Sequence, residues 1–573
     1  MERYYTDNAN QQIVIALLRG HGIRKVIASP GGTNPALVAS FQYDGSFDMY
    51  SCVDERSAAY MACGMAEESG EPVVICCTGA TASRNYYPAL TEAYYRKLPI
   101  IVLTCSRPAH YVGQLMPQVT DRAHYPQDIL VYGDQLQVVK DGIDFENCAY
   151  KVNKALIKAR QRGGGPVHLN IETKTQRCST PQLPVVPMIK YVNSRLDFPT
   201  LPQGKIGIFI GSHKAFDDQT QTAIESFCEE NDAVVLADHT SGYYGKYRVQ
   251  FALIGSQKHA NFDIADLDLL IHIGEVSGDY FSLGAIKGKQ VWRINEDGEV
   301  RIRFNRLDCL FDMDECTFFT NYLTHSGCKH TEFYSRCHEL YDEIQSHIPS
   351  LPLSHLAIAQ KLAPLMPHHS VLHPAIMNAL RSWNFFETDS SIRTNCNVGG
   401  FGIDGCISSL IGASLVHPDK LYFSFVGDLA FFYDLNSLGN RHLGANVRIL
   451  LVNDGGGTEF KHSQWQQYEV GVDAYIAGSG HFGNQSKTLV KAFAENLGFE
   501  YKSASTLTEL DAIIPTFCSP QIGSKPMLVE VFTTAQAQSD AWETIVNLVP
   551  AKAESTSNGK FTAGLKKLLG KIK

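Results

Sequence analysis

Residues 420–460 read KLYFSFVGDLAFFYDLNSLGNRHLGANVRILLVNDGGGTEF, and this stretch decides the fold class. Its apolar runs LYFSFV and VRILLV are typical of buried strands, and the segment between them predicts a helix. A parallel strand–helix–strand unit has a right-handed connection, which brings the C-terminal ends of both strands to one edge of the sheet. Asp428 and Asp454 each follow such an end, so we expect their carboxylates to converge.

The same alternation of apolar runs and helical patterns covers most of the chain. Continuous apolar strands separated by helices predict parallel sheets that are covered on both faces. The upstream runs are KVIASP, MYSCVD, PVVICCTG, PIIVLTCS and PVHLNIE, then KIGIFIGSH, AVVLAD, LDLLIHIGE and KQVWRIN. We therefore expect an α/β protein of three doubly wound parallel-sheet domains, at residues 1–180, 190–330 and 350–550, followed by a tail at 551–573.

Composition excludes several classes of protein. With 573 residues the chain is long enough for three or four domains, and 44% hydrophobic and 19% charged residues are ordinary for a globular protein. A net charge of −9 disfavours nucleic acid as a partner. The 15 cysteines include no CxxC pair, so neither a disulfide framework nor a zinc site is indicated. No signal peptide or membrane-spanning run is found, which predicts a cytoplasmic protein.

The last 23 residues, 551–573, differ from the remainder because six lysines stand against one glutamate. Apolar residues recur near helical spacing in KFTAGLKKLLGKIK, with lysines between them. Such a segment could contact an anionic membrane surface or an acidic partner. A solvated or docked terminal helix remains the alternative.

The converging carboxylates suggest a metal site. Two carboxylates and a backbone carbonyl are hard oxygen ligands suited to Mg²⁺, which keeps other positions for water and phosphate oxygens. The glycines after Asp454 allow close approach of a ligand, and a helix that opens at Asp428 favours anions. The sequence alone leaves an alternative open, in which Asp428 is a helix cap and NDGGG is a turn.

The spacing also resembles a known signature. GD at 427–428, followed by ND at 453–454, is similar to the motif of thiamine diphosphate-dependent enzymes. The resemblance implies that Asp428 and Asp454 bind the metal together with the carbonyl of Gly456. It further implies that Leu429, Ala430 and Gly457 lie along the cofactor.

In the same family a glutamate at the end of a strand contacts the aminopyrimidine ring of the cofactor. VDERSAAYMACGMA has Glu55 at the equivalent place, before an apolar helix. A carboxyl there helps to remove the proton at C2 of the thiazolium, and burial raises the pKa of such a carboxyl. A lone glutamate in a first helical turn is otherwise a partner of the helix dipole.

Longer motifs narrow the resemblance to the synthase family of menaquinone biosynthesis. They are SPGGTNPAL, FDMYSCVDERSAAYMACGMA, TGATASRNYYPALTEAYYRKLPIIVLTCSRP, GFGIDG and GDLAFFYDLNSL. The resemblance implies a pyrimidine-binding, a central and a diphosphate-binding domain, in this order. It also implies that the carbonyl of Phe401 receives the aminopyrimidine, next to Gly402, and that Ile403 supports the bent cofactor.

The substrate residues of that family are only partly kept. Family arginines are replaced by Thr33, after Gly32, by Val398 and by Asn378, and none of these can replace a bidentate arginine. Arg107 and Gln118 are retained as candidate catalytic residues, with Pro117 next to them. Glu459 stands where the family has an apolar residue facing the substrate, so it could bind a hydroxyl or amine, transfer a proton, or face solvent.

We therefore expect thiamine diphosphate- and Mg²⁺-dependent decarboxylation of a 2-oxo acid, with transfer of the resulting acyl carbanion to an acceptor carbonyl or enoate. Catalysis would involve Glu55, Arg107, Gln118 and Glu459. The resemblance also implies a homodimer or homotetramer with active sites at subunit interfaces. A simple 2-oxo acid decarboxylase, a menaquinone-pathway synthase and a non-catalytic scaffold remain as alternatives, and the lost arginines weigh against the menaquinone pathway.

Overall fold

The computed structural model describes residues 4–121, 124–194, 197–324, 329–462, 471–480 and 482–550. The basic tail 551–573, with its expected helix and partner, lies outside these residues. The chain forms two compact units. The first comprises Met1–Asn193 and Gly298–Asp312, and the second Ser194–Asp297 and Met313–Lys573.

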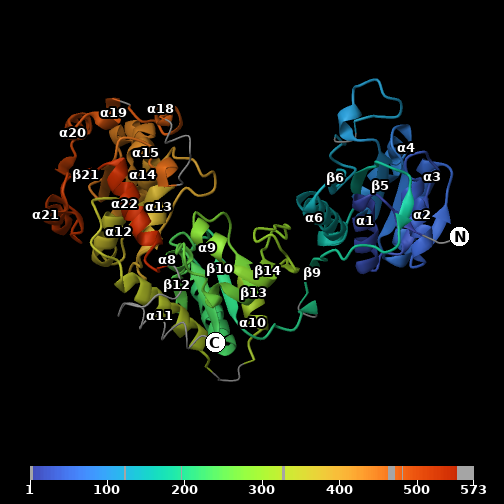
Figure 1. Cartoon of the computed structure of the whole chain (residues 1–573), viewed down its shortest axis with the longest axis horizontal. Coiled ribbons are helices and arrows are strands. Elements are labelled where there is room, and N and C mark those ends of the chain that lie inside the picture. Colours follow the sequence, from blue (N-terminus) through green and yellow to red (C-terminus); the bar gives the residue numbers. More distant parts are fainter. Residues whose placement is uncertain are drawn as a thin grey trace, which may run out of the picture. The chain divides into compact units, whose positions relative to one another are not determined.

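The first unit is built on a six-stranded parallel sheet in the order β3-β2-β4-β5-β7-β6. The strands are β2 (Lys25–Ala28), β3 (Asp48–Ser51), β4 (Val73–Thr78), β5 (Ile100–Ser106), β6 (Tyr132–Leu136) and β7 (Val167–Glu172). Its main helices are α1 (Ala9–Gly20), α2 (Pro35–Asp44), α3 (Glu55–Ser69), α4 (Thr81–Arg84), α5 (Tyr87–Arg96) and α6 (Gly142–Lys158) (Figure 1).

Strand β4 shows why this sheet is covered on both faces. Val74 and Cys76 belong to the hydrophobic core that contains α1, α2 and α6, whereas Val73, Ile75 and Cys77 belong to the core that contains α3 and α5. Successive side chains of a strand point to opposite faces, so a strand that is buried on both must be apolar throughout. The unbroken apolar run that predicted the strand has this physical cause.

Smaller pairings complete the first unit. Strands β1 (Tyr5–Thr6) and β8 (Cys178–Thr180) pair in antiparallel fashion, and β9 (Lys190–Val192) and β15 (Cys309–Phe311) pair in parallel.

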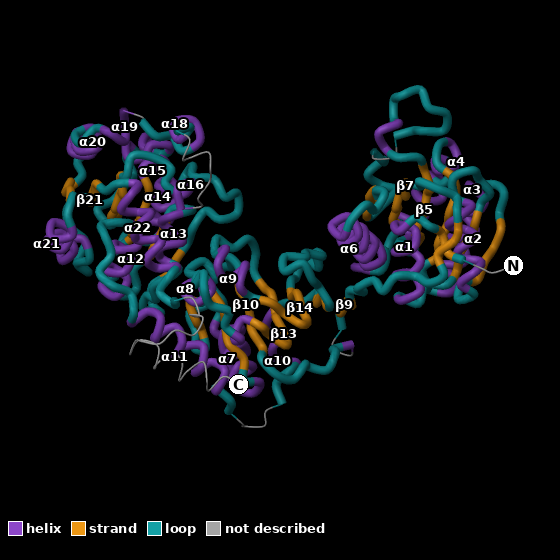
Figure 2. Tube along the Cα trace, in the orientation of Figure 1, coloured by secondary structure: helices purple, strands orange, loops and turns teal. Residues whose placement is uncertain are grey.

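The second unit contains two groups of parallel strands (Figure 2). The first group has the order β12-β11-β10-β13-β14. It comprises β10 (Ile206–Ile210), β11 (Ala233–Ala237), β12 (Arg248–Gln250), β13 (Asp266–Ile273) and β14 (Lys287–Ile294). The helices of this part are α7 (Asp218–Asn231), α8 (Ala252–Gly255), α9 (Tyr280–Ala285), α10 (Glu315–Asn321) and α11 (Glu332–Ser346).

The second group is a six-stranded parallel sheet in the order β17-β16-β18-β19-β21-β20. It comprises β16 (Val371–Pro374), β17 (Arg393–Thr394), β18 (Tyr422–Gly427), β19 (Val447–Asn453), β20 (Glu500–Ala504) and β21 (Met527–Phe532). Its helices are α12 (His355–Leu362), α13 (Asn378–Trp383), α14 (Cys406–Val416), α15 (Asp428–Tyr433), α16 (Glu459–His462), α18 (Asp473–Ile476), α19 (Phe482–Gln485), α20 (Leu489–Asn496), α21 (Leu507–Phe517) and α22 (Ala535–Val546).

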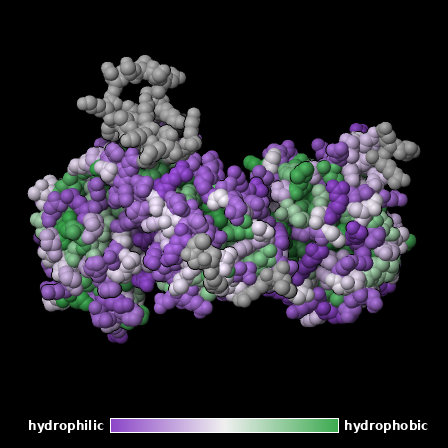
Figure 3. Space-filling model, turned by 90° about the horizontal axis from the view of Figure 1, so that it is seen from below, coloured by the Kyte–Doolittle hydropathy of each residue, from purple (hydrophilic) through white to green (hydrophobic). Residues whose placement is uncertain are grey.

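These sheets confirm the expected α/β class with doubly wound parallel sheets. The three domain ranges, with ends at residues 180, 330 and 550, stay a prediction. All cysteines in the described part of the chain are free thiols. None of the described helices is long and apolar enough to cross a membrane. On the face shown in Figure 3, hydrophobic residues form patches among hydrophilic ones.

Candidate active site

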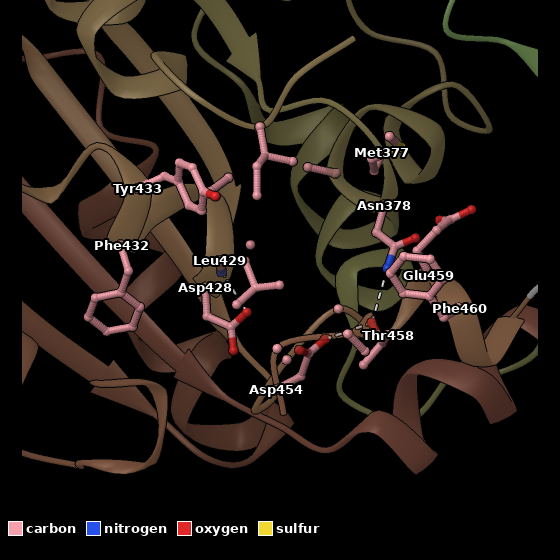
Figure 4. Close-up of a pocket in the computed structure, with 18 of the residues that line it drawn as sticks. Met377, Asn378, Asp428, Leu429, Phe432, Tyr433, Asp454, Thr458, Glu459 and Phe460 are labelled. Atoms are coloured by element: carbon pink, nitrogen blue, oxygen red, sulfur yellow. Dashed lines mark hydrogen bonds between the residues drawn. The ribbon is translucent and has the colours of Figure 1, made fainter. Parts of the chain in front are cut away.

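The expected meeting of Asp428 and Asp454 is seen at the C-terminal edge of the last sheet. Strands β18 and β19 are neighbours in parallel register, with Gly427 opposite Val452. Asp428 begins α15 directly after β18, and Asp454 directly follows β19. Both carboxylates border a cavity of about 730 Å³, and Figure 4 shows them facing one another.

The two carboxylates are held by hydrogen bonds and lie in a buried place. Oδ2 of Asp428 accepts from the backbone N–H of Gly455 at 2.9 Å, and Oδ2 of Asp454 accepts from the Thr458 hydroxyl at 3.0 Å. Asp428 is only 2% exposed. Burial, and then the charge of Asp428, raise the pKa of the Asp454 carboxyl well above its ordinary value. Two carboxylates that are close together and shielded from solvent in this way favour the binding of a cation.

The donor set fits Mg²⁺ better than a transition metal. Among the described residues, no three His, Cys, Asp or Glu side chains gather into a metal-binding group. A cation at Asp428 and Asp454 would therefore need backbone carbonyl and external oxygens as its remaining ligands. Mg²⁺ accepts such a set, because it binds few carboxylates and keeps positions for phosphate oxygens and water.

The glycines after Asp454 pack the loop tightly. Gly455 has φ +92°, a conformation that glycine adopts easily. The N–H of Gly457 donates to the carbonyl of Ala477 at 2.5 Å. A Cβ added at Gly456 or Gly457 would lie 3.0 or 3.1 Å from that carbonyl oxygen, so the turn has no room for side chains.

The other predicted cofactor positions divide into two groups. Ile403, Leu429 and Ala430 line the cavity together with Gly456 and Gly457. Phe401 and Gly402 stand directly before Ile403 but outside that lining. Phe401 has φ +58°, an unusual value for a bulky residue, and its ring lies 5.5 Å from that of Tyr280. Such outliers occur often at functional sites.

The wall of the cavity at Glu459 carries an ion pair that the sequence did not predict. Arg381 donates to Oε1 of Glu459, and its guanidinium lies 4.7 Å from the centre of the Tyr280 ring. The side chains are 9% and 24% exposed, so Glu459 does not simply face solvent. Because Arg381 is already paired, it is not free for a substrate carboxylate.

Asn378 lies next to this pair, and Figure 4 shows it with Glu459 on the side of the cavity away from Asp428. Its amide donates to the Thr458 hydroxyl at 3.0 Å. Oδ1 of Asn378 and Oε2 of Glu459 are buried and have no hydrogen-bond partner among the described residues. The described residues that line the cavity include no lysine or arginine.

Three further residues at or beside the cavity were not predicted from the sequence. His355, at the start of α12, lines the cavity, and Gln538 on α22 donates to Oδ2 of Asp454 at 2.9 Å. Met377, at the start of α13, also lines the cavity and has φ +68°. No local motif marks these positions, because they reach the site through the packing of helices.

The first unit carries the other predicted catalytic residues at one edge of its sheet. Glu55 is the first residue of α3, after β3, and is half-buried. Arg107 directly follows β5 and is exposed. Gln118 is exposed in the loop beyond, with φ +62°. The burial expected around the Glu55 carboxyl is therefore not complete within this unit.

The fold itself uses two positions, Thr33 and Val398, at which the resemblance implied a replaced arginine. The Thr33 hydroxyl donates to the carbonyl of Cys105 at 2.6 Å. Val398 is 3% exposed and packs in a small apolar cluster with Ile376 and Leu380. Neither side chain is available to hold an anionic substrate.

Comparison with known proteins finds a family model and several relatives that are similar to this chain. The family model for the thiamine pyrophosphate enzyme, N-terminal TPP binding domain, matches residues 9–130. This match, together with the relatives described next, supports a thiamine diphosphate-dependent enzyme that forms carbon–carbon bonds.

Its similarity extends over nearly the whole chain to proteins called 2-succinyl-5-enolpyruvyl-6-hydroxy-3-cyclohexene-1-carboxylate synthase. The identity to that of Bacteroides fragilis is 28% over 561 residues, which covers 92% of this chain and 97% of the relative. The identity to that of Phocaeicola vulgatus is 28%, with 92% and 96% covered, and to that of Flavobacterium johnsoniae 27%, with 90% and 97% covered. The expected resemblance is confirmed.

Proposed function

We propose that the protein uses thiamine diphosphate and Mg²⁺ to decarboxylate a 2-oxo acid and to transfer the resulting acyl group to an acceptor carbonyl or enoate. The observation that carries this proposal is the pair of carboxylates, buried Asp428 and half-buried Asp454, at adjacent strand ends above a cavity. When bound, the cofactor supplies an electron sink for the loss of CO₂ and the transfer.

The residues of the second unit would bind and orient the cofactor. Asp428, Asp454 and the carbonyl of Gly456 would hold Mg²⁺ between the protein and the diphosphate. Leu429, Ala430 and Ile403 would line the cofactor, in agreement with their place in the cavity wall. The carbonyl of Phe401 would accept a hydrogen bond from the aminopyrimidine. The apolar lining would keep water from the reacting carbon.

Glu55 would act on the aminopyrimidine held by another copy of the chain. Exposed apolar side chains on α3 and directly before it support this arrangement, since Val53 is 77%, Tyr60 47% and Met61 40% exposed. Such a patch on a globular protein marks an interaction surface. A homodimer, or a tetramer of such dimers, would cover the patch and bury the Glu55 carboxyl. Arg107 and Gln118, at the same edge of the sheet, would then reach the donor 2-oxo acid.

The acceptor would differ from that of the related synthases, whose name describes a carboxylated cyclohexene product. Arg381 is neutralised by Glu459, Val398 is part of a core cluster, and Asn378 binds Thr458. The described lining offers acceptor oxygens instead of cations. An uncharged acceptor with hydroxyl groups, such as an aldose, suits these groups better than a dicarboxylate.

The test is a panel of 2-oxo acids, including pyruvate and 2-oxoglutarate, incubated with protein, thiamine diphosphate and Mg²⁺. Release of CO₂ is expected from at least one donor, and a ligated product is expected with neutral hydroxyaldehydes. Glu55→Gln should abolish the exchange of the C2 proton of the bound cofactor. CO₂ release without any ligation would indicate a simple decarboxylase, and no turnover of any donor would indicate a scaffold.

A further inference from the structure

His355 presents a buried polar atom that the fold leaves without a partner. It is the first residue of α12, it is 7% exposed, and it lines the cavity that Asp428 and Asp454 border. Its Nε2 atom has no hydrogen-bond partner among the described residues. Buried polar atoms of side chains are nearly always paired, so an orphan in a cavity wall needs an explanation.

Gln538 determines which ring nitrogen of His355 carries the proton. The Gln538 oxygen accepts from the backbone N–H of His355 at 3.0 Å, and a backbone N–H can only donate. The other end of the amide is therefore its NH₂ group, which lies 2.9 Å from Nδ1 of His355. Nδ1 must accept this hydrogen bond. In the neutral ring the proton then resides on Nε2, which becomes a donor.

The imidazole is neutral at physiological pH, because burial lowers the pKa of His355 to about 4. A protonated Nε2 has no lone pair for a metal, which excludes His355 as a metal ligand in this tautomer. Nε2 faces Gly427, the last residue of β18, where an added Cβ would lie 3.8 Å away. The donor thus lies beside the strand end from which Asp428 emerges.

The same Gln538 amide also donates to Oδ2 of Asp454 at 2.9 Å. With the Thr458 hydroxyl on the same oxygen, Oδ2 is occupied and Oδ1 remains for a cation. Gln538, itself 3% exposed, therefore connects the tautomer of His355 with the orientation of Asp454. The Nε2–H donor of His355 lies beside the strand end that carries Asp428, an expected Mg²⁺ ligand. An oxygen of a ligand that binds together with Mg²⁺ would be a suitable acceptor for this donor.

We propose that His355 donates a hydrogen bond from Nε2 to a diphosphate oxygen of the cofactor, and that Gln538 positions both this donor and Asp454. This assignment rests on the proposed function, because it takes the cavity as the diphosphate site. A hydrogen bond to a charged oxygen is stronger than one between neutral groups and would contribute to affinity for the diphosphate, not for the thiamine rings.

The test compares the dissociation constants for thiamine diphosphate and for thiamine, each with Mg²⁺, by calorimetry. His355→Phe removes the donor, and the preference for the diphosphate should fall by about ten- to a hundredfold. His355→Gln can place an amide N–H near the Nε2 position and should retain most of the preference. His373→Phe is the matched control, because His373 is 8% exposed, has an unpartnered Nε2 among the described residues, and does not line the cavity.

A second measurement does not depend on a variant. In protein with ¹⁵N-labelled histidine, NMR should show His355 with its proton on Nε2, and this nitrogen should shift when thiamine diphosphate and Mg²⁺ bind but not with thiamine. An Nδ1–H tautomer, or an unchanged preference in His355→Phe, would overturn the assignment. Failure of the wild-type protein to bind thiamine diphosphate at all would instead refute the proposed function.

Discussion

Replacing Glu459 by leucine tests how the substrate side of the cavity is built. Arg381 is 9% exposed, and Glu459 is its ion-pair partner on the cavity side. Removal of one partner leaves a buried guanidinium without a counter-charge, which typically costs about 3–5 kcal/mol. The Tyr280 ring, 4.7 Å from the guanidinium, remains and offsets part of this loss. We therefore expect a cost of about 3 kcal/mol for Glu459→Leu.

Thermal unfolding measures this cost. For a cooperative unit of 150–250 residues, about 3 kcal/mol corresponds to a decrease of roughly 6–12 °C in melting temperature. The double variant Arg381→Met/Glu459→Leu removes both charges and keeps apolar volume, so it should melt within a few degrees of wild type. Glu500→Gln, which changes an exposed carboxylate on strand β20, is the matched control.

The same variant connects stability with substrate choice. In Glu459→Leu the free guanidinium should bind a carboxylate, so added acetate should restore part of the lost melting temperature. Carboxylated acceptors should also compete better with neutral hydroxyaldehydes in the ligation assay. Two results would refute a buried ion pair of Arg381 and Glu459. Glu459→Leu would have the melting temperature of wild type, or the double variant would melt no higher than Glu459→Leu.

Three further predictions concern other parts of the molecule. Burial, and then the charge of Asp238, raise the pKa of Asp279 to about 6. The neutral Asp279 carboxyl therefore contributes fully to the free energy of unfolding below about pH 4, and this contribution falls by about 3 kcal/mol as the pH rises through 6. Asp279→Asn should flatten this part of the melting-temperature profile, and an unchanged profile would contradict it. Met61→Glu places a charge in the apolar patch and should shift the oligomer towards monomer in light scattering. If the molecular mass of Met61→Glu equals that of wild type, the patch is not part of the subunit interface. Asp454→Asn should raise the melting temperature of the apoprotein and abolish the further rise that thiamine diphosphate and Mg²⁺ cause in wild type. EDTA should abolish the same rise in wild type. A lower melting temperature of the Asp454→Asn apoprotein would contradict this prediction.

The sequence predicted those features that depend on local pattern and chain direction. The run PVVICCTG forms β4, because a strand buried on both faces needs apolar residues at every position. Asp428 and Asp454 face each other because a right-handed crossover brings consecutive parallel strand ends to one edge. Both arguments need only the periodicity of the strands and the handedness of the connection.

Contacts between distant helices could not be predicted in this way. His355 and Gln538 are 183 positions apart and meet because α12 packs against α22. Arg381 and Glu459 are 78 positions apart, and the sequence suggested Glu459 only as a substrate residue or a solvent-exposed one. The partner of a polar side chain depends on the crossing of two helices, which a single sequence does not specify.

The loss of folding stability caused by the two like charges of Asp428 and Asp454 helps to decide whether the chain is an enzyme or a scaffold. A buried pair of like charges opposes folding, as the raised pKa of Asp454 indicates. Left-handed backbone at Met377 and Phe401 adds further strain at the same site. A scaffold would gain stability by losing these features, because stabilising substitutions are easily reached where no function opposes them. The simplest physical reason to retain them is a cation and a diphosphate that bind only the folded chain. The arginine replacements that the resemblance implies at Thr33, Val398 and Asn378 agree with the proposed change of acceptor, because they leave Asp428 and Asp454 in place.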